Sequence, residues 1–367
     1  MPRDGVLPVP GSDWLEPFER WAPQKRLTRD RQPLILSGHG VRMRIDRSSL
    51  FVQNGFTRYP QQREEWRFFP GDWRLPSRIV VIDSDGSLTF DVLAWLSEQR
   101  IPLVQVDWRG HATVVGGGAS YVGDFKLVAA QRAAQANPKH TMAISRWLIA
   151  EKIARSRETL TRAVEPSPPR ERALEELAAS DRELKTRPLR TKDGLRGIEG
   201  RVAQAYFTAW RSLPLRWKGI ARKPIPEDWH RIGSRVSPES ETNRQATHPV
   251  NAMLNYGYAI LESQIRMAVT AAGLDPTIGF MHAQHRGRAA FVLDLMEPLR
   301  PAIDETVLHF VGTQTFSPAD FTISSKGICR LHSQLARRVV GEVLPFDGLG
   351  PIISDLPKRF RRVTACD

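Results

Sequence analysis

The sequence predicts an α+β protein in which a β-rich N-terminal domain is followed by a larger all-α domain. Apolar and polar residues alternate before about residue 116, whereas apolar residues recur at spacings of three and four beyond it. A glycine run at 116–118 separates the two patterns. The chain has 367 residues, beyond the size at which one core keeps growing. We therefore expect an extension at 1–30, a β-rich domain at 31–120 and an α-helical domain at 121–367.

The N-terminal region carries strand signals. Val41, Met43 and Ile45 alternate with polar residues, and the next apolar segment leads into Asn54-Gly55, which predicts the tight turn of a β-hairpin. Further strands are predicted over 79–82, 101–106 and 112–115. A short helix is expected between the first two of these, capped by Ser87 or Thr89.

The remaining chain has helical patterns. Segments 125–136, 142–160 and 195–210 are amphipathic, and 171–184 is a charged helix. Segment 212–249 is rich in proline and polar residues and is predicted to be a long loop. The strongest helix spans 251–273, because Gly273 suits a left-handed C-terminal cap and Pro276 follows it. The basic residues around Phe360 form a C-terminal tail that could neutralise phosphates, and a solvated tail is the alternative.

The charge of the chain points to a polyanionic partner. The formal net charge is +13, which favours nucleic acid first and an anionic membrane surface second. The alternative is a basic protein from a host with arginine-rich composition. A membrane-spanning run and a signal-peptide pattern are both lacking in the sequence, and the two cysteines suit reduced thiols, so we expect a cytoplasmic protein without a membrane role.

Three residues that could carry chemistry lie in segment 279–301. Asp294 and Glu297 are three residues apart inside an apolar run, so both carboxylates point to one side if the run is helical. His282 lies about twelve residues before Asp294, after a glycine-containing turn, and could return to that side. A carboxylate in an apolar run is costly unless it is paired or binds a metal, and oxygen ligands with one imidazole suit Mg²⁺ or Mn²⁺. The alternative is that Asp294 pairs with Arg300 or Arg288 and that His282 is a satisfied core residue.

Glu199 is a second acidic candidate. It opens an amphipathic helix and falls on or beside the apolar face, so its carboxylate could point inward. The alternative is a carboxylate that interacts with the dipole at a helix N-terminus.

Basic residues interleaved with an aromatic residue predict contacts to a phosphate backbone. Each could equally belong to a solvated loop. The candidates for DNA binding are Arg216, Lys218, Arg222, Lys223, Arg235, Arg286 and Arg288.

Taken together, the ordered segments 197–207, 248–262, 273–282 and 291–301 resemble the CRISPR-associated integrases, the Cas1 family. The segment SLTFDVLAWLSEQRIPLVQVDWRG resembles the β domain of that family. The resemblance covers roughly residues 33–340.

The resemblance implies a β domain that mediates homodimerisation and a helical catalytic domain. It implies that Glu199, His282 and Asp294 are the catalytic metal ligands, with Glu297 as a further ligand or a neighbour of the ligands. It also implies a small partner, Cas2, and insertion of short double-stranded DNA into a CRISPR array, by attack of a 3′-hydroxyl on a phosphodiester. Positioning and a divalent ion supply most of the catalysis in such reactions.

The sequence departs from the family pattern in the N-terminal extension, in the charged segment 165–193 and in a lengthened link before residue 251. Two alternatives therefore remain: a structure-selective DNA nuclease, and a non-enzymatic DNA-binding assembly subunit. The nuclease would release free fragments where an integrase would join strands. In the assembly subunit, the acidic residues would serve only folding.

Overall fold

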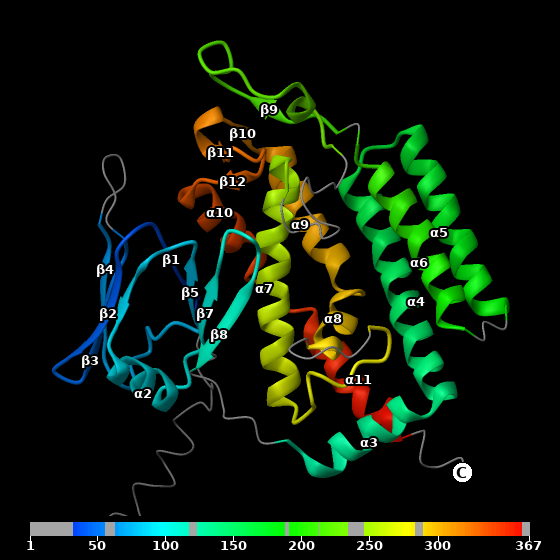
Figure 1. The fold of residues 1–367 in the computed structure, drawn as a ribbon, viewed down its shortest axis with the longest axis horizontal. Coiled ribbons are helices and arrows are strands. Elements are labelled where there is room, and N and C mark those ends of the chain that lie inside the picture. Colours follow the sequence, from blue (N-terminus) through cyan, green and yellow to red (C-terminus); the bar gives the residue numbers. More distant parts are fainter. Residues whose placement is uncertain are drawn as a thin grey trace, which may run out of the picture.

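The computed structural model describes residues 32–55, 63–116, 123–187, 191–211, 213–233, 246–282 and 289–361. Strands come first and helices follow, which confirms the coarse order predicted from the sequence (Figure 1). The extension predicted at 1–30 lies outside the described residues. The domain boundary predicted at residue 120 falls between described segments and stays a prediction.

The first sheet has the strand order β1-β5-β7-β8. Strands β1 and β7 run parallel to β5, whereas β8 runs antiparallel to β7. The predicted strand at 79–82 is confirmed to the residue. The bounds of the strands are Leu34–Ser37 for β1, Ile79–Ile82 for β5, Leu103–Val106 for β7 and Ala112–Gly116 for β8.

The second sheet has the strand order β4-β3-β2-β6. Its strands are β2 (Val41–Asp46), β3 (Ser49–Gln53), β4 (Glu65–Phe68) and β6 (Gly86–Leu88). The β2–β3 turn lies at Arg47 and Ser48, with φ of 49° and 65°. Two consecutive positive φ values match the twist of a two-residue hairpin. Asn54-Gly55 begins the connection from β3 to its antiparallel neighbour β4, and because Asn54 pairs with Glu64 this connection is too long for the tight turn that was predicted there. Asn54 instead accepts a hydrogen bond from the Ser37 amide at 2.9 Å.

The first sheet is the middle layer of the molecule. Side chains alternate along its strands, so Ile79 and Leu103 face the second sheet and α2 (Phe90–Glu98). Val80 and Val104 point the other way and join the core of the helical region. Figure 1 shows α7 and α10 beside this sheet. One face of the first sheet therefore belongs to the same apolar core as the helices.

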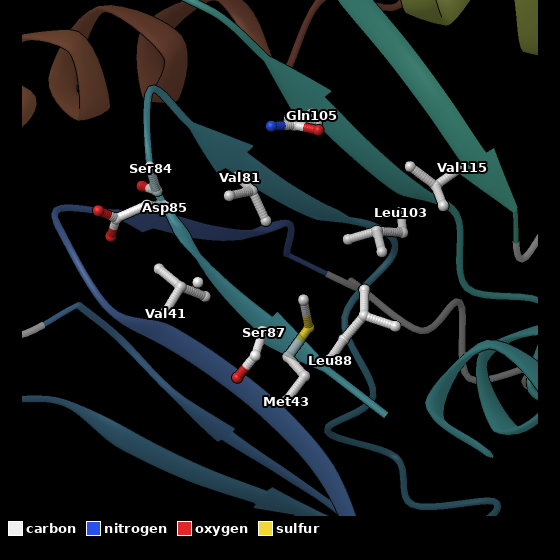
Figure 2. Close-up of a pocket in the computed structure, with 11 residues that line it drawn as sticks. Val41, Met43, Val81, Ser84, Asp85, Ser87, Leu88, Leu103, Gln105 and Val115 are labelled. Atoms are coloured by element: carbon white, nitrogen blue, oxygen red, sulfur yellow. The ribbon is translucent and has the colours of Figure 1, made fainter. Parts of the chain in front are cut away.

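A pocket of about 180 Å³ lies between the two sheets (Figure 2). Apolar side chains including Met43, Leu88 and Leu103 form its wall, with Ser84 and Asp85 among its polar lining residues. All of its lining residues belong to the β-rich part, so this pocket is separate from the acidic residues considered below.

The helices follow the predicted pattern closely. The predicted helix at 125–136 is confirmed to the residue, and α4 extends the predicted 142–160 at both ends. The bounds are α3 (Phe125–Ala136), α4 (Pro138–Ala163), α5 (Pro168–Thr186), α6 (Lys192–Thr208), α7 (Pro249–Ala271), α8 (Ala290–Met296), α9 (Arg300–Thr313), α10 (Ser333–Val343) and α11 (Leu349–Arg361).

The C-terminal region is not all-α, which corrects that part of the predicted fold class. Strand β9 (Arg216–Trp217) pairs in parallel with β10 (Thr315–Phe316), and β11 (Phe321–Ile323) pairs with β12 (Cys329–Leu331). Short 3₁₀ helices span Glu227–His230 and Pro318–Asp320. Part of the segment predicted as a long loop therefore has regular structure, because its backbone pairs with a distant strand.

Helix α7 passes through the centre of the helical part (Figure 1). A Cβ at Gly257 would lie 2.7 Å from Ile303 Cγ2, so glycine permits the close approach of α7 and α9. Within the described residues, we find no helix that is both long enough and apolar enough to cross a membrane.

Candidate active site

Helices α4, α6, α8 and α9 bring an acidic cluster together in the helical part. Lys152 of α4 donates to Glu199 Oε1 at 2.7 Å and to Glu297 Oε2 at 2.6 Å. Arg300 Nη1 donates to the other Glu297 oxygen, Oε1, at 2.6 Å. Two glutamates from distant parts of the chain thus share one ammonium group, which neutralises part of their charge.

The cluster is largely screened from water. The side chain of Glu297 is 3% exposed, that of Lys152 is 13% exposed and that of Glu199 is 24% exposed. Burial alone would raise the pKa of Glu297, but Arg300 and Lys152 outweigh it and lower that pKa to about 2. Glu297 is therefore ionised at neutral pH, which is what a cation ligand requires.

Asp294 lies in α8, fully buried, and its carboxylate faces the backbone of the loop before it. Oδ1 accepts from the His282 amide at 2.9 Å, and Oδ2 accepts from the amides of Met281, at 3.1 Å, and Phe280. The His282 ring Nδ1 lies 2.8 Å from Oδ1. Because a carboxylate offers about four lone-pair positions, these four contacts saturate Asp294.

His282 is held by Asp294 and reaches toward solvent. Its side chain is 40% exposed, and its hydrogen bond to Asp294 raises its pKa more than burial lowers it. With Nδ1 donating to the carboxylate, the lone pair of the neutral ring lies on Nε2. A carboxylate that orients an imidazole in this way is the usual arrangement behind a metal-bound histidine.

The loop that carries His282 is fixed by packing. A Cβ at Gly279 would lie 2.7 Å from the Ala290 Cβ, so only glycine lets the loop approach α8 this closely. The Phe280 ring stacks on Phe360 of α11, with centroids 5.7 Å apart. Phe360 is fully buried, so the alternative of a solvated tail is wrong at this residue, which is part of the support of the loop.

The structure divides the predicted site residues into two groups. Glu199 and Glu297 meet at Lys152, whereas His282 and Asp294 contact each other. Arg300 pairs with Glu297 and not with Asp294, so the ion pair considered for Asp294 with Arg300 is wrong. Among the described residues, no three His, Cys, Asp or Glu side chains stand in position to hold a metal ion together.

Basic side chains that were not predicted to belong to the site surround the cluster. Lys152 contacts both glutamates, and Arg300, considered only as a partner of Asp294, contacts Glu297. A small notch beside Glu199 is lined by Lys192 and Arg196. The spacing of Lys192, Arg196 and Glu199 on one helix face was visible in the sequence. The Lys152 contact was not, because 145 residues separate it from Glu297.

The predicted DNA-binding residues fall in two places. Arg216, Lys218, Arg222 and Lys223 are exposed around β9. Trp217 anchors this segment, because it stacks on Trp229 at 5.9 Å and its indole donates to the Trp229 carbonyl at 3.1 Å. The other candidates, Arg235, Arg286 and Arg288, lie outside the described residues.

The fold, strands followed by a helical part, is also found in solved structures. A casposase bound to integration product superposes with a TM-score of 0.72 and 20% identity, covering 92% of this chain and 91% of that one. A Cas1 protein from Thermotoga maritima gives a TM-score of 0.67 and 18% identity, covering 91% and 97%. A Cas6-RT-Cas1–Cas2 complex gives 0.64 and 20%, covering 90% and 35%. The fold is therefore the one shared by Cas1 proteins and this casposase.

The sequence relationships define the family. Residues 34–344 match the family described as CRISPR associated protein Cas1, and the chain belongs to this family. The predicted family is thereby confirmed. A CRISPR-associated endonuclease Cas1 of Archaeoglobus fulgidus is 29% identical, over 72% of this chain and 76% of that protein. One of Methanospirillum hungatei is 34% identical, but the match spans only 45% of this chain and 44% of that protein. The relatives agree with the predicted class, a CRISPR-associated endonuclease.

Proposed function

We propose that this chain is a metal-dependent DNA endonuclease and integrase that inserts short DNA into a CRISPR array during adaptation. The observation that carries the proposal is the pair of converging carboxylates, Glu199 and Glu297, which Lys152 bridges, together with the electrostatic interaction between Glu297 and His282. Membership of the Cas1 family and the casposase-like fold support it. The reaction is attack of a DNA 3′-hydroxyl on a phosphodiester.

The types of donor, carboxylate and imidazole, suit a divalent cation, although among the described residues three of them do not yet surround one point. Two carboxylates already share one ammonium, and the imidazole presents Nε2 as a further donor. We therefore assign Glu199, Glu297 and His282 as ligands of Mg²⁺ or Mn²⁺. Asp294 has its lone pairs engaged, so we assign it the role of orienting His282. When bound, the ion would activate the hydroxyl and stabilise the charge on the phosphate.

The basic segment around β9 is proposed to hold the DNA backbone. Its exposed cations, together with Arg235, Arg286 and Arg288, could neutralise several phosphates. In the same way, we propose that the β-rich region forms the homodimer and that Cas2 is the partner. The fold-level match to a Cas1 chain from a Cas2 complex supports the second of these.

Replacing Arg216, Lys218, Arg222 and Lys223 by alanine is expected to weaken binding of duplex DNA. If each cation contacts one phosphate, the slope of log affinity against log salt should become about 3 to 4 units less steep. Fluorescence anisotropy over a salt series measures this. A control variant that neutralises Arg157, Arg162, Arg172 and Arg182 on α4 and α5 changes the net charge equally. Equal losses in both variants would contradict a specific role for the β9 segment.

A strand-transfer assay tests the proposed function. Purified protein, Mn²⁺ or Mg²⁺, a short duplex with 3′ overhangs and a supercoiled plasmid are combined, with His282→Ala alongside. Joined products are expected from the wild type and should disappear in the variant, because a metal ligand is lost. His309→Ala, on the exposed face of α9, is the matched control and should retain activity. Cleavage without joining would favour the nuclease, and DNA binding without any reaction would favour the assembly subunit.

A further inference from the structure

Lys152 stands where a cation between the two glutamates would stand. Its ammonium contacts Glu199 Oε1 and Glu297 Oε2 at 2.7 and 2.6 Å. These distances are those of short, charge-assisted hydrogen bonds. One atom therefore bridges carboxylates that belong to α6 and to the C-terminal end of α8.

The position of Lys152 conflicts with a divalent ion on the same carboxylates. The ammonium holds one oxygen of each glutamate and Arg300 holds the other oxygen of Glu297, so a metal that binds both glutamates would contact an oxygen that a cation already holds and would lie close to the ammonium. Two positive ions a few ångströms apart repel strongly in a partly buried site. The metal and the ammonium therefore compete for the place between the two carboxylates.

The other cation of the cluster does not present the same conflict. Arg300 holds Glu297 Oε1, whereas Lys152 holds Oε2. If Lys152 leaves, Arg300 can still satisfy one oxygen of Glu297 and fix its orientation. Lysine also suits a group that must move, because its compact charge sits on a flexible four-carbon stem.

We propose that Lys152 is an internal substitute for the metal: it holds Glu199 and Glu297 together in the metal-free protein and leaves them when a divalent ion binds. Lys152 is thus a positioning residue that keeps the acidic cluster assembled and sets its affinity for metal. This inference rests on the proposed metal site at Glu199 and Glu297.

The test measures Mn²⁺ binding to the full-length protein by isothermal titration calorimetry, at one fixed pH and without DNA. Lys152→Met removes the competing charge but keeps the length of the side chain. Its Mn²⁺ dissociation constant is expected to fall by about tenfold, which corresponds to loss of one cation–cation repulsion at a partly buried site. Lys139→Met, at an exposed position of the same helix, is the control and should bind as the wild type does.

A second measurement uses the wild-type protein and so does not depend on how the variant folds. An amine-reactive reagent is applied with and without Mn²⁺, and labelling of Lys152 is measured by mass spectrometry. Labelling should rise when Mn²⁺ is present, because the ammonium leaves its two carboxylates.

The outcomes separate the inference from the proposed function. One outcome is that Glu199→Gln loses Mn²⁺ binding while folded Lys152→Met binds Mn²⁺ no more tightly than the wild type. This outcome would overturn the inference but would support the proposed metal site. If Lys152→Met does not fold without metal, the labelling experiment decides. The inference is overturned if Mn²⁺ binds to the wild type and the labelling of Lys152 does not rise. Failure of the wild type to bind Mn²⁺, or binding that Glu199→Gln leaves unchanged, would remove the proposed metal site and the inference with it.

Discussion

Replacement of Glu297 by glutamine is expected to lower strand transfer on the order of 10³-fold, the rate equivalent of losing about 4 kcal/mol of transition-state stabilisation. Glutamine keeps the size of the side chain but removes the charge that a divalent ion requires. Glu297 is nearly fully buried and directly contacts two cations. Water therefore has little access to take over the role of its lost carboxylate. The same change should strongly weaken Mn²⁺ binding measured by calorimetry.

Two further variants help to explain the loss of strand-transfer activity in Glu297→Gln. Glu297→Asp keeps the charge on a shorter side chain and should recover part of the activity. Glu262→Gln, on the surface pair with Arg266, is a matched control and should react as the wild type does. Normal Mn²⁺ affinity in Glu297→Gln, together with lost affinity in Asp294→Asn, would reverse the roles that we assign to these two acids.

Local patterns predicted much of the fold because they depend on neighbours in the sequence. The strand at 79–82 and the helix at 125–136 were predicted to the residue. The β2–β3 turn was missed, because Arg47 and Ser48 adopt positive φ without the glycine or asparagine that usually signals it. The β9–β10 pair was missed since it joins Arg216 to Thr315, and two-residue strands have no period to detect.

The candidate site was predictable in composition but not in its internal contacts. Apolar surroundings correctly marked Asp294 and Glu297 as unusual acids. The sequence could not show that the Asp294 carboxylate faces the backbone amides of the preceding loop and the Glu297 carboxylate faces Lys152, because Lys152 lies 145 residues away in the sequence. Spacing of three residues placed them on one side of the helix, yet their partners differ completely.

Asp294→Ala is expected to reduce the free energy of unfolding by about 3 to 5 kcal/mol, because a fully buried carboxylate and its hydrogen bonds are lost. The amides of Phe280, Met281 and His282 would all lose their acceptor in a buried loop. Urea denaturation followed by circular dichroism measures the change. Asp91→Ala, at an exposed position in the first turn of α2, is the control and should cost within about 1 kcal/mol.

Asp294→Asn separates the effect on folding from the effect on His282. Asparagine keeps the shape of the side chain but removes the negative charge that favours the protonated imidazole. In metal-free protein, the pKa of His282 lies above 6.5 because of Asp294, so it should fall toward or below that value in the variant. The population of protonated His282 then disappears at a lower pH, which an NMR titration of the ring detects. A pKa of His282 that does not change would show that Asp294 does not orient the ring, and Asp294 would again be a candidate for direct metal binding.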